Sequence, residues 1–231
     1  MLAEKVPTIA FFGDSVTQGC FELTIGDAHQ LDTVFAAENG YPRDFRRILS
    51  LLYPNVPINV IHAGISGDGT NSGVRRLERD VLSYHPDLTV VCYGLNDVHR
   101  GMDFLSTYTD NLATIFDAIK AQGGEIIFMT PNMMNTDVRG YDLTPDQMEL
   151  YQKIAFKTAD IQNNGMFDAF IKAAKQTAKK HGVPVCDVYA KWKKLHENGV
   201  SVTHLLSNQI NHPVREMHWL FAFALIDTIF N

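Results

Sequence analysis

The chain has 231 residues, of which 45% are hydrophobic and 20% are charged, and its formal net charge is -6. These proportions are ordinary for a globular protein with a sizeable core, and the length suits one large domain or two small ones. The lysine and arginine residues form no stripe, which argues against nucleic acid as a partner, and no apolar segment approaches the length of a membrane span.

Apolar runs alternate with helical patterns along the whole chain. The predicted strands lie at 8–12, 58–61, 88–93, 125–129 and 183–188. The predicted helices lie at 42–52, 74–84, 105–122, 167–181 and 214–230. The strands are short and show little alternation between apolar and polar residues, which is typical of parallel strands covered on both faces. Two of the helices end at Gly123-Gly124 and at Gly182, just before the next strand.

This alternation predicts an α/β fold with three layers, α/β/α, around a doubly wound parallel sheet of about five strands. No stretch rich in proline, glycine or serine divides the chain, so we expect one domain over residues 1–231. In such sheets, ligands bind beyond the carboxyl ends of the strands.

The segment 131–165 is the least regular part of the chain. It contains a predicted helix from about 146 to 160, for which Thr144 is a candidate cap, with Pro145 at the first position and Gln147 completing a capping box. The segment is either an insertion that lines a substrate pocket or a connector that packs elsewhere.

Four short blocks carry the candidate chemistry: GDSVT at 13–17, AGISG at 63–67, GLND at 94–97 and NHP at 211–213. The first three follow predicted strands, so Ser15, Gly64 and Asn96 are expected on one rim of the sheet. Together with His212, they supply a hydroxyl nucleophile, a backbone N–H without a Cβ, a side-chain amide and an imidazole base. These are the groups that acyl transfer requires.

Each block has a simpler structural interpretation. Ser15 could be a turn serine, Gly64 could serve only a tight turn, and most of the nine histidines of the chain are expected to be structural, including His218. The glycine-rich run 64–73 lacks the Gly-Lys-Ser/Thr ending of a phosphate loop and the spacing of a dinucleotide fingerprint. The presence of all four blocks in one chain favours the catalytic interpretation.

The four blocks resemble those of the SGNH hydrolases, also called the GDSL esterase/lipase family, over residues 11 to about 222. The resemblance implies a flavodoxin-like strand order of 2-1-3-4-5, with Ser15 as nucleophile and His212 as general base. It also implies an oxyanion hole made by Gly64, Asn96 and the Ser15 N–H. The nucleophile elbow of α/β-hydrolases is not expected, because Thr17 stands where its second glycine would be.

The chain departs from this family at one position. The usual aspartate three residues before the histidine is replaced by Gln209, which follows Asn208. Neither residue carries a charge. We therefore expect a Ser–His dyad in which Gln209, Asn208 or a nearby main-chain oxygen orients the imidazole.

The predicted function is a serine esterase or acylhydrolase that cleaves short acyl esters, with carbohydrate O-acetyl groups as the leading expectation. The alternatives are a non-catalytic carbohydrate-binding protein and an acyltransferase. We expect a small-molecule ester as partner, no nucleic acid, no membrane, no cofactor and no metal. The segment 20–23 is a candidate for the leaving-group side of the site. The odd number of cysteines (Cys20, Cys92 and Cys186) and an N-terminus unlike a signal peptide suggest the cytoplasm.

Overall fold

The computed structural model describes residues 5–25, 30–141 and 143–231. Its central feature is a five-stranded sheet in the order β4-β1-β5-β6-β7, with every neighbouring pair parallel. The strands are β1 (Thr8–Gly13), β4 (Asn59–Gly64), β5 (Leu88–Cys92), β6 (Glu125–Met129) and β7 (Val185–Cys186). In chain order this is 2-1-3-4-5, which confirms the flavodoxin-like order.

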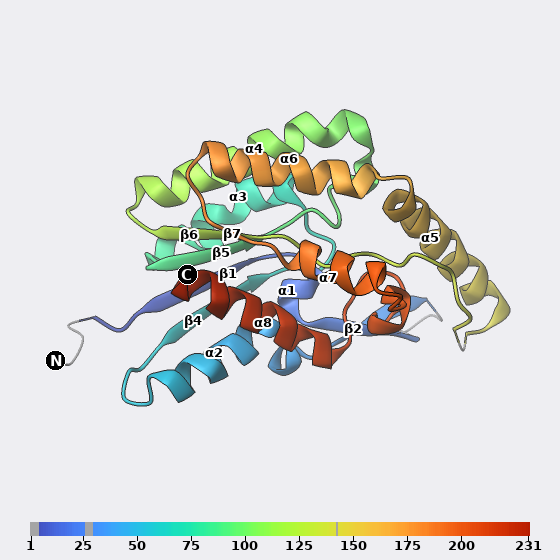
Figure 1. The fold of residues 1–231 in the computed structure, drawn as a ribbon, viewed down its shortest axis with the longest axis horizontal. Coiled ribbons are helices and arrows are strands. Elements are labelled where there is room, and N and C mark those ends of the chain that lie inside the picture. The colour runs from blue at the N-terminus through green and yellow to red at the C-terminus, as the bar shows by residue number, and fades with distance from the viewer. Residues whose placement is uncertain (1–4, 26–29, 142) are drawn as a thin grey trace.

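Helices cover both faces of this sheet and confirm the three-layer α/β/α fold (Figure 1). Helices α3, α4 and α6 lie on one face, and α2 and α8 lie on the other. The α-helices are α1 (Ser15–Gln18), α2 (Tyr41–Leu52), α3 (Thr70–Asp80), α4 (Leu105–Ala121), α5 (Pro145–Asn163), α6 (Met166–Lys180), α7 (Val188–Glu197) and α8 (Arg215–Phe230). Short 3-10 turns occur at Ala37–Asn39, Leu82–Tyr84, Val98–Arg100, Met102–Phe104 and Val202–Leu205.

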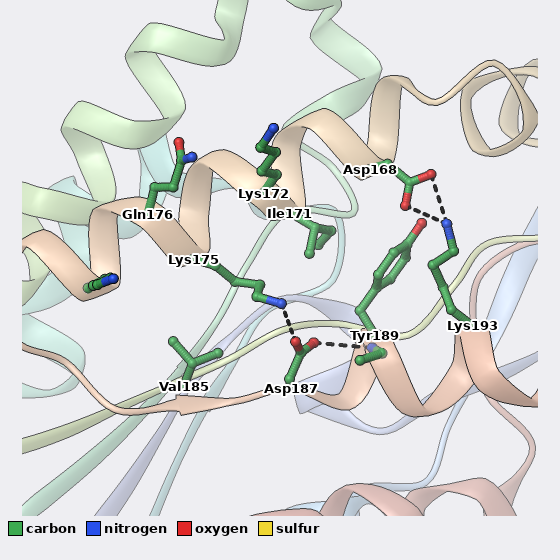
Figure 2. Close-up of a pocket in the computed structure, with 11 residues that line it drawn as sticks. Asp168, Ile171, Lys172, Lys175, Gln176, Val185, Asp187, Tyr189 and Lys193 are labelled. Atoms are coloured by element: carbon green, nitrogen blue, oxygen red, sulfur yellow. Dashed lines mark hydrogen bonds and ion pairs between the residues drawn. The ribbon is translucent and has the colours of Figure 1, made fainter.

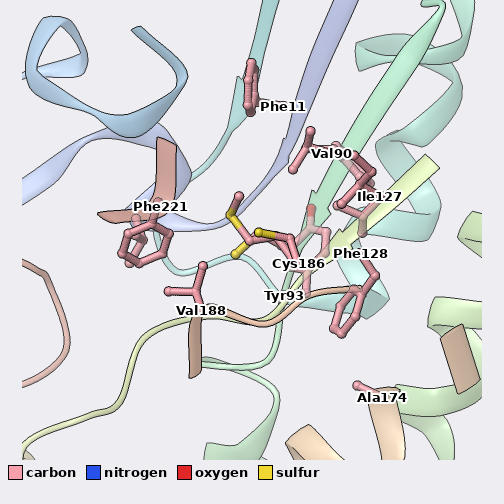
Figure 3. Close-up of a cluster of buried hydrophobic side chains, with 14 of the residues drawn as sticks. Phe11, Val90, Tyr93, Ile127, Phe128, Ala174, Cys186, Val188 and Phe221 are labelled. Carbon is pink, nitrogen blue, oxygen red and sulfur yellow. The ribbon is translucent and has the colours of Figure 1, made fainter. Parts of the chain in front are cut away.

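Aromatic and aliphatic side chains fill the space between the sheet and each helical layer (Figure 3). On one face, Phe11 of β1 meets Phe45 of α2 with ring centroids 5.6 Å apart. On the other, Phe128 of β6 meets Phe116 of α4 at 5.9 Å. All four rings are fully buried. Because the strands are covered on both faces, they carry continuous apolar runs rather than an alternating pattern.

The last predicted strand is much shorter than expected. The run 183–188 forms a strand only at Val185–Cys186, and α7 begins at Val188. The side chain of Asp187 accepts a hydrogen bond from the backbone N–H of Ala190 at 3.1 Å. This is an N-cap, and it turns an apolar run into the start of a helix.

A two-stranded antiparallel sheet of β2 (Cys20–Ile25) and β3 (Leu31–Phe35) was not predicted. The first of its strands, β2, follows directly after α1. Both strands contain polar residues, such as Glu22 in β2 and Asp32 in β3. The connecting residues 26–29 lie outside the described part of the chain. A marginal hairpin of this kind is stabilised by what packs against it, which periodicity does not reveal.

The segment 131–165 contains the expected helix, which extends over Pro145–Asn163, and its capping box joins Thr144 and Gln147. Around it lies a second, smaller apolar cluster, in which Tyr151, Ala155 and Ile210 are buried. Residues of the β2–β3 hairpin and of the segment 138–148 surround these three. The segment therefore links the hairpin to the loop that carries the C-terminal histidine block. Among the described residues, no helix has the length and apolar character needed to cross a bilayer.

Candidate active site

The sheet places the first three blocks at one level of its rim. Gly13, the last residue of β1, is paired with Gly64 at the end of β4 and with Cys92 at the end of β5. Ser15 follows Gly13 immediately and begins the short helix α1. Asp14 caps the N-terminus of this helix, because its side chain accepts a hydrogen bond from the backbone N–H of Val16 at 3.0 Å.

The fourth block, with His212, contacts the first, with Ser15, although the two are 197 positions apart in the sequence. The hydroxyl oxygen of Ser15 lies 3.0 Å from Nε2 of His212. Both side chains are almost fully buried, since Ser15 is 3% exposed and His212 is 6% exposed. A hydroxyl and an imidazole at this distance can exchange a proton.

The other ring nitrogen of His212 is held by the backbone. Nδ1 lies 3.1 Å from the carbonyl oxygen of Phe21 in β2. A carbonyl only accepts hydrogen bonds, so Nδ1 carries the proton and Nε2 presents its lone pair to Ser15. Of the three candidates for orienting the ring, the main-chain oxygen therefore occupies the position, and Gln209 and Asn208 do not.

Asn208 instead holds the turn before the histidine. Its side-chain oxygen accepts hydrogen bonds from three successive backbone N–H groups: those of Ile210 (3.0 Å), Asn211 (2.9 Å) and His212 (2.9 Å). Gln209 adopts a left-handed backbone conformation with φ 55°. Its side-chain oxygen is buried and has no hydrogen-bond partner among the described residues.

The segment 131–165 supports the same turn from the other side. The side chain of Asn132 donates to the carbonyl of Asn211 at 2.9 Å. The backbone N–H of Asn135 donates to the carbonyl of Ile210 at 2.8 Å. The turn that carries His212 is thus fixed by its own asparagine and by this segment together.

Burial sets the electrostatics of the two central ionisable groups. Burial lowers the pKa of His212 to about 4, and the hydrogen bond to Phe21 opposes this effect. The ring is therefore neutral at pH 7 and able to accept a proton. Burial also raises the pKa of Asp14 to about 7, against the hydrogen bond from Val16.

Gly64 ends the neighbouring strand β4, and Asn96 lies just beyond the end of β5. A Cβ on Gly64 would lie 2.3 Å from the backbone nitrogen of Gln18, so β4 can approach α1 this closely only with glycine at this position. Asn96 is half-buried in the turn after β5. Its side-chain amide donates to the carbonyl oxygen of Asp68 at 2.8 Å.

A buried arginine beneath this rim was not identified from the sequence. The guanidinium of Arg76 in α3 donates to the carbonyls of Gly13 and Ala63, each at 2.8 Å. It also donates to the carboxylate of Asp68 and to the hydroxyl of Tyr93, each at 2.6 Å. One side chain therefore joins the ends of β1 and β4 to the loop that fixes Asn96. Nothing in the local sequence separates Arg76 from its exposed neighbours.

The second histidine near the site is structural, as expected. His218 in α8 is fully buried, and its Nδ1 accepts a hydrogen bond from the backbone N–H of Tyr41 at 3.0 Å. Its ring stacks on that of Phe221 with centroids 5.8 Å apart. Burial holds its pKa at about 3. Within the described part of the chain, no three His, Cys, Asp or Glu residues are grouped so as to hold a metal ion.

A groove between α6 and α7, with a volume of about 630 Å³, lies apart from this site (Figure 2). It is lined by neither Ser15 nor His212. Two of its lysines are neutralised by acids: Lys193 pairs with Asp168 at 3.0 Å, and Lys175 pairs with Asp187.

Two relatives with similar sequences are esterases. The chain is 27% identical to an acetylxylan esterase from Geobacillus stearothermophilus over 170 residues, which are 69% of this chain and 74% of that protein. It is 34% identical to an arylesterase from Vibrio mimicus over 107 residues, which are 46% of this chain and 52% of the relative.

Solved structures share the whole fold. The crystal structure of the Geobacillus stearothermophilus acetylxylan esterase has a TM-score of 0.71 at 22% identity and covers 99% of this chain and 96% of its own. A lipase/acylhydrolase from Enterococcus faecalis has a TM-score of 0.68 at 22% identity, with 96% and 95% covered. Catalytic mutants of the acetylxylan esterase replace a serine, a histidine and an aspartate three residues before that histidine.

The sequence model of the GDSL-like lipase/acylhydrolase family matches residues 11–220, which include all four blocks. The chain therefore belongs to this family and is a carboxylic ester hydrolase.

Proposed function

We propose that this protein hydrolyses short acyl esters through a Ser15–His212 dyad. The observation that carries the proposal is the hydrogen-bonded series from Ser15 to His212 to the carbonyl of Phe21, with distances of 3.0 Å and 3.1 Å. It contains a nucleophile, a base with its lone pair directed at that nucleophile, and an acceptor that fixes the base.

In the first half of the reaction, Nε2 of His212 takes the proton from the Ser15 hydroxyl as the oxygen attacks the acyl carbon. The carbonyl electron pair moves onto the acyl oxygen and forms a tetrahedral intermediate. The intermediate collapses, the bond to the alcohol breaks, and His212 returns its proton to the departing oxygen. Water then repeats the sequence on the acyl-serine and releases the acid.

The backbone N–H groups of Ser15 and Gly64 and the side chain of Asn96 are the proposed oxyanion donors. The Asn96 amide carries two hydrogens, and one of them is used on Asp68. The second is free for the substrate, while the first holds the amide in place. Each such donor contributes about 10²–10³ to turnover.

A carbonyl in place of a carboxylate keeps one of the two functions that the usual aspartate performs. It holds the imidazole in the tautomer with Nδ1 protonated, and loss of that tautomer lowers kcat by about 10⁴ in serine proteases. It carries no full charge with which to stabilise the imidazolium. The dyad is therefore a working base that gains less electrostatic help than a triad.

The proposed substrates are acetyl esters, with O-acetylated carbohydrates first. Support comes from the acetylxylan esterase among the relatives, and the arylesterase makes aryl acetates suitable test substrates. Small-molecule esters are the proposed partners, with neither nucleic acid nor membrane involved. The three cysteines are free and buried, consistent with the cytoplasm as the proposed location.

The test is hydrolysis of p-nitrophenyl esters from acetate to laurate, and of acetylated xylo-oligosaccharides, by the wild type, Ser15→Ala and His212→Ala. We expect the acetate to react best and each variant to lose activity by about 10³-fold or more at unchanged fold. Equal activity in all three proteins would exclude the dyad. Preference for laurate would exclude the short-acyl assignment. Product formation on an added alcohol at the expense of free acid would identify an acyltransferase.

A further inference from the structure

The carbonyl that holds His212 lies in an irregularity of the β2–β3 hairpin. Cys20 is paired with Phe35, but Leu23 is paired with Thr33, so β2 has one more residue than β3 between these pairs. The extra residue places Phe21 within a β-bulge. Because a bulge leaves backbone groups out of the ladder, the Phe21 carbonyl is free to accept from a side chain.

A carbonyl released from the ladder needs another means of orientation, and Arg215 contacts both residues of its peptide unit. The two terminal nitrogens of Arg215 donate to the two carboxylate oxygens of Glu22, one of them at 3.0 Å. The guanidinium carbon also lies 4.3 Å from the centroid of the Phe21 ring. Both contacts are geometrically specific, since the pair is bidentate and the cation lies over an aromatic ring.

The position of Arg215 in the chain strengthens this connection. It follows His212 by three residues and begins helix α8, so the base and the arginine belong to one continuous segment. The Phe21 ring also contacts His218 of the same helix, with centroids 5.0 Å apart. The strand that supplies the acceptor is therefore attached to the segment that supplies the donor.

We propose that Arg215 and Glu22 are positioning residues that fix the Phe21–Glu22 peptide, and with it the carbonyl that replaces the family's aspartate on His212. The peptide unit is planar, so holding the side chains at both of its ends limits the rotation of the C=O between them. This inference rests on the proposed dyad. It assigns to an ion pair the orientation that a carboxylate provides directly in a triad.

The pair is well suited to an orienting role and poorly suited to a role in global stability. Both side chains are 37% exposed, and ion pairs at that exposure stabilise a fold only slightly. The Arg215 hydrogen bonds hold the pKa of Glu22 below its usual range, which favours the charged form of the pair. An effect on turnover can therefore be separated from an effect on folding.

The variants are Arg215→Met, which keeps an apolar stem on the Phe21 ring, and Glu22→Gln, which keeps the shape of the carboxylate. The exchange variant Glu22→Arg/Arg215→Glu restores opposite charges. Lys193→Met is the matched control, because its ion pair with Asp168 has similar exposure (36% and 41%) and lies in the groove of Figure 2, which contains no residue of the dyad.

Two measurements are made on each protein: kcat and KM for p-nitrophenyl acetate, and the ¹⁵N spectrum of the histidine ring nitrogens. We expect kcat to fall by about 10- to 100-fold in both single variants with KM nearly unchanged, because a misplaced base affects the chemical step. The His212 signals should change from one tautomer with Nδ1 protonated to a mixture. The exchange variant should recover part of the kcat and part of the single tautomer of His212.

The proposal is wrong if both single variants resemble Lys193→Met in kcat and in tautomer. It is also wrong if kcat falls without a change of tautomer, because the pair would then affect turnover by a route other than the orientation of the His212 ring. The tautomer is read without turnover, so it tests the positioning role even if Ser15→Ala shows that the dyad is not catalytic.

Discussion

At the scale of single residues, the site depends on where one imidazole obtains its hydrogen-bond acceptor. Replacing a carboxylate by the carbonyl of Phe21 removes a negative charge from the vicinity of His212. Nothing then offsets the burial of the ring apart from that hydrogen bond, and the pKa of His212 stays near 4. The carbonyl acceptor that fixes the tautomer of His212 therefore also sets the pH range over which the ring stays neutral.

We expect the acid limb of kcat/KM to lie near pH 4 instead of near 6.5. Protonation of Nε2 removes the base, and burial disfavours the protonated form, so activity persists as the pH falls until it approaches the lowered pKa. A pH profile with p-nitrophenyl acetate, corrected for spontaneous hydrolysis and for any unfolding seen by circular dichroism, tests this. A limb near 6.5 would mean that the ring is more solvated or carries a charged partner.

The alanine variants of Asn208 and Gln209 should differ sharply in turnover and in stability. Asn208→Ala removes the acceptor of three backbone N–H groups, and buried donors left unpaired cost about 1–3 kcal/mol each. Its turnover and stability should both fall. Gln209→Ala removes a side-chain oxygen with no partner in the described structure, so kcat should change less than about threefold. Kinetics and urea unfolding of both variants measure this, and a large loss of kcat in Gln209→Ala alone would contradict the assignment of Phe21.

At the scale of elements, the close approach of α1 to β4 sets the geometry of the rim. Ser15 begins α1, and Gly64 ends β4 against the backbone of that helix. The two glycines Gly13 and Gly64 are paired in register, and Arg76 binds the carbonyls beside them. The proposed nucleophile and one proposed oxyanion donor are thus held by backbone contacts, which leave no room for a side chain at Gly64.

Gly64→Ala should damage both turnover and stability. The added Cβ would lie 2.3 Å from the Gln18 backbone nitrogen, so α1 must move and Ser15 must move with it. Overpacking of this kind costs about 1–3 kcal/mol, and a displaced nucleophile can cost about 10²-fold in kcat. Gly140→Ala is the matched control, because its Cβ would meet nothing within 4 Å. Equal kcat in the two variants would show that the rim tolerates a side chain at Gly64.

At the scale of the whole molecule, two separate apolar clusters stabilise different parts of the structure. The large one joins the sheet to its two helical layers. The small one, around Tyr151, joins the hairpin that supplies the Phe21 carbonyl to the turn that carries His212. Each half of the donor–acceptor pair on Nδ1 therefore belongs to an element that the small cluster supports.

On heating, the Tyr151→Ala variant should lose activity at a lower temperature than the one at which its central sheet unfolds. Truncating a buried aromatic costs about 3–5 kcal/mol, and here the loss falls on the small cluster. Activity measured after a temperature series should be lost below the midpoint seen by circular dichroism. Tyr151→Phe is the control, because its hydroxyl is buried without a partner among the described residues and its removal should be neutral or stabilising. Coincident loss of activity and secondary structure would show that the two clusters unfold as one.

Much of the fold and part of the site follow from sequence patterns. The strand order is confirmed, but it was expected from the family resemblance, because hydrophobic periodicity does not specify which strands are neighbours. Both helical layers are also confirmed, because continuous apolar runs separated by helices have few solutions in a doubly wound sheet. Ser15, Gly64 and Asn96 were placed at strand ends for the same reason. The β2–β3 hairpin and the start of α7 were missed. In both, a local feature, a bulged edge strand or the Asp187 cap, outweighs the apolar pattern.

By itself, the sequence determined the layered sheet, its family resemblance and the placement of three of the four blocks, those of Ser15, Gly64 and Asn96, at one rim. It determined also that no carboxylate stands three residues before His212. Only the tertiary structure decided what takes its place, because a main-chain carbonyl is present in every residue and leaves no mark in the sequence. Phe21 and His212 are 191 positions apart, and a bulge, an ion pair and two packed elements bring them within hydrogen-bond distance.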